Sequence, residues 1–275
     1  MKIAAIQMIS GPQVAPNLAR AGELIARAAG DGARLVALPE YFPLIGASDA
    51  DRLAAREQPG TGPIQAFLAD AAARHGIWLV GGSLPLFARA ADKLRNTMFV
   101  FDPQGRALAR YDKIHLFGFR KGDESYDEAA TIERGDAPVA LDFAIDGIAL
   151  RVGLGICYDL RFPELFRTLG RTAALDLIVL PAAFTETTGR AHWEVLLRTR
   201  AIENQCYVLA PAQGGRHPGG RLTHGHSLLI DPWGEIVACP PAADGKGECI
   251  VTGDLDPARI ADVRTSLPAL QHRLL

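Results

Sequence analysis

The chain has 275 residues, of which 48% are hydrophobic and 22% charged, and its formal net charge is −2. This composition is typical of a globular protein and excludes the charge-rich, hydrophobe-poor class of disordered chains. The small net charge, without a long basic run, gives no electrostatic reason to expect a nucleic-acid or membrane partner, so we expect a small-molecule ligand.

The N-terminal residues and the cysteines favour a cytoplasmic location. The opening residues MKIAAIQM alternate between apolar and polar at once, without the basic segment, apolar run and cleavage site of an export signal. Apolar runs are about as long as a strand, well below the roughly 18 residues that a membrane helix needs. Four widely spaced cysteines suit free thiols in a reducing compartment: Cys157, Cys206, Cys239 and Cys249.

Strand-like and helix-like segments alternate along the first half of the chain. Residues 2–8 alternate as a strand, and residues 17–29 carry apolar side chains at helical spacing. A short apolar strand at 35–38 ends at Pro39-Glu40. The predicted elements that follow are a helix at 64–71, a strand at 77–80, and a hairpin of strands 96–101 and 106–111.

The second half repeats this plan, which predicts the architecture. The similar pairs, in order, are 35–39 with 177–181, 77–80 with 206–210, and 100–105 with 229–234. Two such halves, each a sheet with helices on one face, would bury their apolar sheet faces against each other. We therefore predict an α/β fold, a four-layer α-β-β-α sandwich with a pseudo-twofold internal repeat, in which residues 1–275 form one domain. A doubly wound three-layer sheet is the alternative. The stretches 119–132 and 213–221 are predicted to be exposed loops.

Cys157 is placed between an apolar strand and the start of a helix. The segment Val152-Gly-Leu-Gly-Ile-Cys157-Tyr-Asp-Leu-Arg-Phe-Pro163 leads through a short turn to a proline, which suits the first position of a helix. A thiol at such a corner is held rigidly, and nearby backbone N–H groups can point at a developing oxyanion. An isolated cysteine is more commonly a small core residue, so neighbouring motifs have to decide.

Two other strands end in an isolated charge. Ala37-Leu-Pro-Glu40 puts a carboxylate directly after a buried strand, and Tyr111-Asp-Lys113-Ile-His-Leu-Phe puts an amine among apolar residues. Each alone more often marks a strand end that reaches solvent. Together with Cys157 they supply a base, an electrophile and a nucleophile at carboxyl ends of strands, where α/β proteins assemble sites.

These three segments resemble the signature segments of the nitrilase (carbon-nitrogen hydrolase) superfamily, in the family's order and at similar spacing. The resemblance covers nearly the whole chain and is greatest to deaminated glutathione amidases, which are neighbours of the ω-amidases. The further segments that carry it are 188–194, 200–207, Gly225-His-Ser, Asp231-Pro-Trp-Gly and 267–273.

The resemblance implies a mechanism. Glu40 would take the proton of Cys157, the thiolate would attack an amide carbon, and Lys113 and the N–H of Tyr158 would bind the oxyanion. Ammonia would leave, and water activated by Glu40 would hydrolyse the thioester. Glu128 fits the family's second glutamate, which would orient Lys113 or the water.

The resemblance also bears on ligands and assembly. We expect a small carboxylate-bearing amide as substrate, contacted by Tyr158, Arg161, Phe184 and His192, with no metal or cofactor. Carboxylate pairing could involve Arg161, Arg190, Arg216 or Arg221. Family members pair through helices near the nucleophile, here 163–169 and 191–204, so we expect a homodimer or a larger homo-oligomer.

Several alternatives remain at this point. The substrate could instead be α-ketoglutaramate, an N-carbamoyl amino acid or a nitrile, and the chain could be a catalytically silent scaffold of the same fold. A zinc site at His217, His224 and His226 is disfavoured because no carboxylate or cysteine joins them at ligand spacing. A papain-type Cys-His pair, a serine amidase at Gly81-Gly-Ser and a phosphate-binding loop each lack their accompanying residues.

Overall fold

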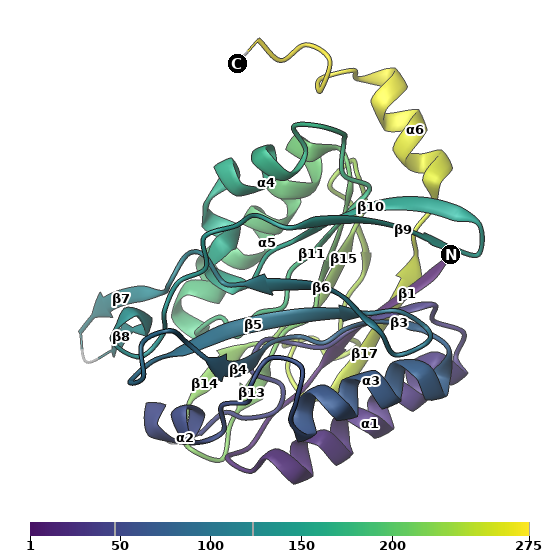
Figure 1. The fold of residues 1–275 in the computed structure, drawn as a ribbon. Helices are drawn as coiled ribbons and strands as arrows, with labels where there is room; N and C mark the ends of the chain where they lie inside the picture. The colour runs from purple at the N-terminus through teal and green to yellow at the C-terminus, as the bar shows by residue number, and fades with distance from the viewer. Residues whose placement is uncertain (47, 123, 275) are drawn as a thin grey trace.

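A computed structural model describes residues 1–46, 48–122 and 124–274, and two β-sheets packed face to face form its centre (Figure 1). The first sheet comprises β1 (Lys2–Gln7), β2 (Leu35–Ala37), β3 (Trp78–Val80), β4 (Leu84–Phe87), β5 (Leu94–Phe101), β6 (Ala107–Asp112) and β17 (Cys249–Asp254). Its order is β17-β1-β2-β3-β5-β4, with β6 also paired to β5.

The second sheet has six strands in the order β16-β15-β12-β11-β10-β9. They are β9 (Ala140–Ile145), β10 (Ile148–Leu154), β11 (Leu177–Val179), β12 (Tyr207–Ala210), β15 (Leu228–Ile230) and β16 (Ile236–Ala238).

The pairing pattern of the first sheet recurs in the second. Three parallel strands, β1-β2-β3 and β10-β11-β12, form the middle of each sheet. An antiparallel strand borders each trio on one side, and an antiparallel pair, β5–β6 or β15–β16, borders it on the other. The first sheet has β4 as an additional strand, paired with β5. The predicted repeat is therefore confirmed, with β11 as the counterpart of β2 and β12 as that of β3.

Helices cover the outer faces of both sheets, which makes four layers (Figure 1). The first sheet is covered by α1 (Val14–Gly30) and α3 (Pro63–His75), the second by α4 (Pro163–Leu169) and α5 (Glu186–Asn204). Two further helices, α2 (Asp49–Ala54) and α6 (Pro257–Ser266), lie at the periphery. Among the described residues, no helix is both long and apolar enough to cross a membrane.

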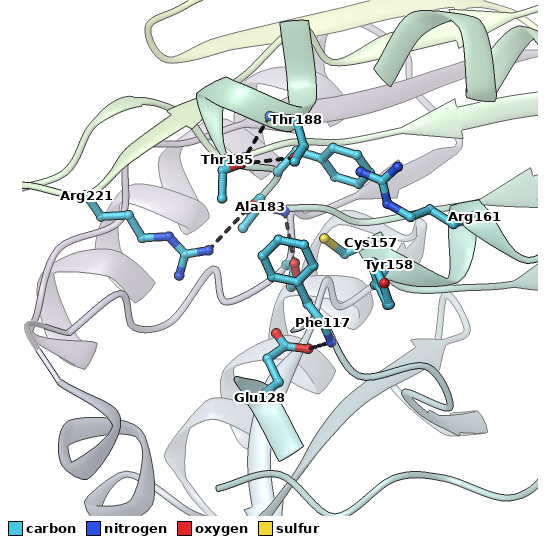
Figure 2. Close-up of a pocket in the computed structure, with 11 residues that line it drawn as sticks. Phe117, Glu128, Cys157, Tyr158, Arg161, Ala183, Thr185, Thr188 and Arg221 are labelled. Carbon is cyan, nitrogen blue, oxygen red and sulfur yellow. Dashed lines mark hydrogen bonds between the residues drawn. The ribbon is translucent and has the colours of Figure 1, made fainter. Parts of the chain in front are cut away.

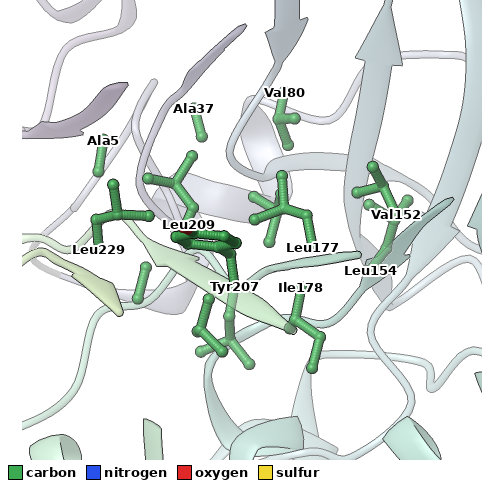
Figure 3. Packing of buried hydrophobic residues seen from close by; sticks show 14 of the residues in the cluster. Ala5, Ala37, Val80, Val152, Leu154, Leu177, Ile178, Tyr207, Leu209 and Leu229 are labelled. Atoms are coloured by element: carbon green, nitrogen blue, oxygen red, sulfur yellow. The ribbon is translucent and has the colours of Figure 1, made fainter. Parts of the chain in front are cut away.

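Strand alternation explains the layering, because successive side chains of a strand point to opposite faces. In β1, Ile3 and Ala5 belong to the core between the sheets, whereas Ala4 and Ile6 belong to the core beneath α1 and α3. Figure 3 shows the central layer, where Ala5, Ala37 and Val80 of the first sheet face side chains of the second.

Two segments predicted to be exposed loops are instead hairpins. Residues 119–132, apart from Asp123, which lies outside the described residues, contain β7 (Gly118–Lys121), β8 (Glu124–Asp127) and the 3-10 helix η1 (Glu128–Ala130). Phe119 pairs with Tyr126 across this hairpin, an alternation too short to recognise from sequence.

The second of these hairpins pairs β13 (Gly214–Arg216) with β14 (Leu222–His224). The two glycines of its first strand are buried, and a Cβ on Gly214 would lie 2.6 Å from the amide of Gln7 in β1. Here glycine serves close packing rather than an exposed loop.

Candidate active site

Cys157 occupies a strained corner between β10 and α4. It begins the 3-10 helix η2 (Cys157–Arg161) with φ of 49°, a left-handed conformation uncommon for a residue other than glycine. Its N–H donates to the carbonyl of Pro181 at 2.9 Å. Only 8% of the residue is exposed, and Figure 2 shows its sulfur pointing into a pocket. The backbone thus fixes the direction of the thiol.

Glu40 lies three residues beyond the end of β2 and is almost completely buried. Its Oε1 accepts from Asn96 Nδ2 at 2.9 Å and from Lys113 Nζ at 2.8 Å. Its Oε2 accepts from the backbone N–H of Ala183 at 2.9 Å. These donors come from both halves of the chain, in β5, just after β6 and after β11, and they hold the carboxylate in one orientation.

Lys113 bridges the two carboxylates that the sequence predicts for the site. Its Nζ lies 2.8 Å from Glu40 Oε1 and 2.8 Å from Glu128 Oε2. Glu128, the first residue of η1, also accepts from Tyr41 Oη and from the N–H of Phe117, each at 2.8 Å. The β7–β8 hairpin therefore delivers Glu128 to the amine.

The buried cluster carries one positive and two negative charges, and this balance shifts the pKa values of its members. Burial lowers the pKa of Lys113, but the charges of Glu128 and Glu40 outweigh this effect and hold it well above its ordinary value. Burial raises the pKa of Glu128, but Lys113 acts in the opposite direction, and the pKa of this carboxyl lies below its ordinary value. Lys113 is therefore a permanent cation at neutral pH.

The thiol of Cys157 is neutral in the resting site. Burial and then the charge of Glu40 raise the pKa of Cys157 well above its ordinary value, and the opposing effect of Lys113 is too small to reverse this. The thiol therefore needs a base. Transfer of its proton to Glu40 would leave the net charge of the cluster unchanged, whereas loss of the proton to solvent would add a buried negative charge.

Asp159 ties the segment that carries Lys113 to the turn that carries Cys157. This carboxylate is fully buried and accepts from Tyr111 Oη at 2.7 Å, from the N–H of Ile156 at 2.8 Å and from the N–H of His115 at 3.1 Å. Sequence reasoning missed Asp159, Asn96 and the Tyr41 hydroxyl. A polar side chain inside an apolar strand, as at Asn96, is the signal that could have found one of them.

A pocket opens over the thiol (Figure 2). It is lined by Glu40, Phe117, Glu128, Cys157, Tyr158, Arg161, Ala183, Phe184, Thr185, Thr188 and Arg221. Of the residues predicted to contact substrate, Tyr158, Arg161 and Phe184 line this pocket.

His192 does not line the pocket. It lies one turn of α5 beyond Thr188, and its Nδ1 contacts the guanidinium of Arg161 at 3.1 Å. Arg161 thus stands between His192 and the pocket. Among the other arginines considered for carboxylate pairing, Arg190 lines a separate hollow and Arg216 is exposed.

The histidines considered for zinc are separated by the fold. His224 and His226 stack with ring centroids 4.0 Å apart, but both nitrogens of His217 lie within hydrogen-bond distance of Ser10 and Thr223. Glu186 approaches His224 at 3.6 Å. No group of three potential metal ligands forms within residues 1–46, 48–122 and 124–274.

The sequence is similar to known proteins over nearly its whole length. The sequence profile of the family described as carbon-nitrogen hydrolase matches residues 2–265. A deaminated glutathione amidase of Synechocystis sp. (strain PCC 6803 / GT-S) is 44% identical, covering 98% of this chain and 97% of that protein. An omega-amidase of Homo sapiens is 37% identical, with 99% and 94% covered.

A solved structure confirms the fold. The crystal structure of a Saccharomyces cerevisiae protein, described as a member of branch 10 of the nitrilase superfamily, superposes with a TM-score of 0.86. It is 32% identical, and the alignment covers 100% of this chain and 97% of that one.

Proposed function

Because the chain belongs to the carbon-nitrogen hydrolase family, we propose that it is an amidase that cleaves the C–N bond of a small carboxylate-bearing amide through a Cys157 thioester. The observation that carries this proposal is the buried Glu40–Lys113–Glu128 cluster beside a neutral thiol. A silent scaffold of the same fold would have no need to keep two carboxylates and an amine out of water, because burial of such charges is costly.

In the first step Glu40 takes the proton of Cys157, and the thiolate attacks the amide carbon. The oxyanion then receives hydrogen bonds from Lys113 Nζ and from the N–H of Tyr158, which belongs to the first turn of η2, where N–H groups have no partner within the helix. Collapse of the intermediate breaks the C–N bond, and Glu40 returns its proton to the leaving nitrogen.

In the second step Glu40 takes a proton from water, which attacks the thioester. The C–S bond breaks and the acid leaves, and Glu40 returns its proton to the Cys157 thiolate. Glu128 keeps Lys113 oriented through two contacts, at 2.8 and 3.1 Å, so that the amine stays at the oxyanion position in both steps.

Replacing Glu40 with glutamine tests its role as the base. We expect kcat to fall by more than about 100-fold, the lower end of what general acid–base catalysis contributes. The pKa of Cys157 should fall at the same time, because the charge of Glu40 is one of the causes that raise it. The pH midpoint of iodoacetamide alkylation should therefore move to lower pH than in the wild type.

Two results would contradict this role. An unchanged alkylation midpoint would mean that Glu40 does not act on the thiol. Accumulation of acyl-enzyme at the wild-type rate would restrict Glu40 to hydrolysis of the thioester.

We propose deaminated glutathione as the favoured substrate, because the relative at 44% identity is named for that activity. An amide also suits Lys113, since its tetrahedral intermediate develops full charge on oxygen, which the first adduct of a nitrile does not. Deaminated glutathione is a substituted amide, so its leaving group is an amine, and ammonia would be released only from a primary amide such as α-ketoglutaramate.

A substrate panel checks this choice. We expect kcat/KM to be higher for deaminated glutathione and α-ketoglutaramate than for an aliphatic nitrile or an N-carbamoyl amino acid. Product detection by mass spectrometry follows all four reactions. A nitrile preferred over both amides would leave only the family assignment standing.

A homodimer formed through α4 and α5 is the assembly we propose. Val195 and Ile202, seven residues apart and thus on one face of α5, are 59% and 48% exposed. Sedimentation should give twice the 29.4 kDa mass of the chain, and Ile202→Lys should shift the protein toward monomer. A 29.4 kDa species alone at micromolar concentration would contradict the assignment.

The catalytic thiol also bears on location and organisation. Cys157 must stay free, which favours a reducing compartment, and we propose the cytoplasm. Because Glu40 receives donors from both halves of the chain, Asn96 and Ala183, we propose that the whole chain works as one domain.

A further inference from the structure

Two arginines lie on opposite sides of the thiol. Figure 2 shows Arg221 on one side of the pocket and Arg161 on the other, with the sulfur of Cys157 between them. Arg161 belongs to η2, the turn that also contains Tyr158. A substrate bound across Cys157 therefore meets a guanidinium toward each of its ends.

Two hydrogen bonds of Ala183 place Glu40 and Arg221 against the same residue. Its N–H donates to Glu40 Oε2 at 2.9 Å, and its carbonyl accepts from Arg221 NH2 at 3.2 Å. Glu40 must lie near the leaving nitrogen in order to return the proton. On this geometry a leaving amine near Glu40 would extend toward Arg221, and the acyl chain toward Arg161.

A hollow beyond Arg221 gives the leaving amine space. The cavity at the thiol encloses about 10 Å³, roughly the room of one water. The adjoining hollow measures about 240 Å³ and shares Arg221 with the pocket. Its other walls include Tyr41, Leu44, Ile45, Tyr126 and the paired side chains of Asp49 and Arg52.

Two arginines, Arg52 and Arg221, line this hollow, and Arg221 is the one that can pair with a ligand. Arg52 is already paired with Asp49. The guanidinium of Arg221 lies 5.7 Å above the ring of Tyr126, and its buried Nε has no hydrogen-bond partner among the described residues. A planar guanidinium with an unused donor suits a carboxylate.

We propose that Arg221 selects amides whose leaving amine carries a carboxylate, as in an amino acid or a short peptide, over amides that release ammonia or an uncharged amine. This inference rests on the proposed function and extends it to the leaving-group side of the same site.

A matched pair of substrates tests the proposal: deaminated glutathione and its C-terminal carboxamide, which differ only in the charge of the leaving dipeptide. In the wild type kcat/KM should be about tenfold to hundredfold higher for the carboxylate, the range expected for a charge-assisted hydrogen bond. Arg221→Gln should bring the ratio close to one. Arg221→Lys, which keeps charge without the planar fork, should give an intermediate ratio.

Arg216→Gln is the matched control, because Arg216 lies on the same hairpin but is exposed and lines neither cavity. This variant should keep the wild-type ratio. A wild-type ratio near one, or an Arg221→Gln protein with an undiminished ratio, would overturn the proposal while leaving the amidase function intact. Failure of both compounds to acylate Cys157 would instead reject the proposed function, and this inference with it.

Discussion

Cys157→Ala is expected to lose about 10⁵-fold or more in kcat, because removal of a nucleophile disables all steps that depend on it. The fold should survive. Loss of one buried sulfur atom costs on the order of 1 kcal/mol in the free energy of unfolding, well within the stability of an ordinary domain. Product release measures the first effect, and far-UV circular dichroism with thermal unfolding measures the second.

Cys206→Ala is the control for this variant. Cys206 is fully buried in the same core cluster, and burial raises the pKa of its thiol above the ordinary value, so it is also a neutral buried thiol. It lies outside the pocket, and its replacement should change thermal stability by a similar amount without affecting turnover. Activity of Cys157→Ala within tenfold of the wild type would make the nucleophile assignment wrong.

Lys113→Met should cost more than 100-fold in kcat, since loss of one oxyanion donor typically removes about 2.7 to 4 kcal/mol of transition-state stabilisation. It should also lower stability, because two buried carboxylates lose their shared cation.

The same variant should change how stability depends on pH, because the lowered pKa of Glu128 depends on Lys113. That carboxylate stabilises the wild type above its unfolded pKa, and the contribution is lost as pH falls through its folded value. This acid-dependent loss should be smaller in Lys113→Met.

The double variant Lys113→Met with Glu128→Gln separates catalysis from folding. It removes one of the two carboxylates that the single variant leaves without a cation, so the melting temperature should recover in part. The rate should stay low, because no amine remains to bind the oxyanion. A rate that recovers together with the melting temperature would show that Lys113 serves only to balance charge.

The sequence predicts the fold well where the signal is local. Alternation in β1, the helical spacing in α1 and the ordered similarity of β2 to β11 depend on neighbouring residues, and the four-layer sandwich follows from them. The β13–β14 hairpin was missed because its burial comes from distant contacts. Gly214, for example, packs against Gln7, some 200 residues away in sequence.

The residues of the site could likewise be predicted where the signal is local in the sequence. Glu40 and Cys157 stand at strand ends that the sequence marks, so their proximity could be inferred. The donor from Ala183 to Glu40 is a backbone group 143 residues away and leaves no trace in residue type. Glu128 reaches Lys113 only because a hairpin too short to recognise turns it inward.

The pairing of β17 with β1 has a consequence for how the protein is made. The register joins Lys2 with Asp254, so β1 is synthesised long before the strand that covers its edge. Until then β1 presents unpaired N–H and C=O groups, a template for association with other chains. Joining residues so far apart also closes a long loop, which slows folding. During the interval between synthesis of β1 and of β17, this uncovered edge is therefore a point at which a nascent chain can associate with other chains.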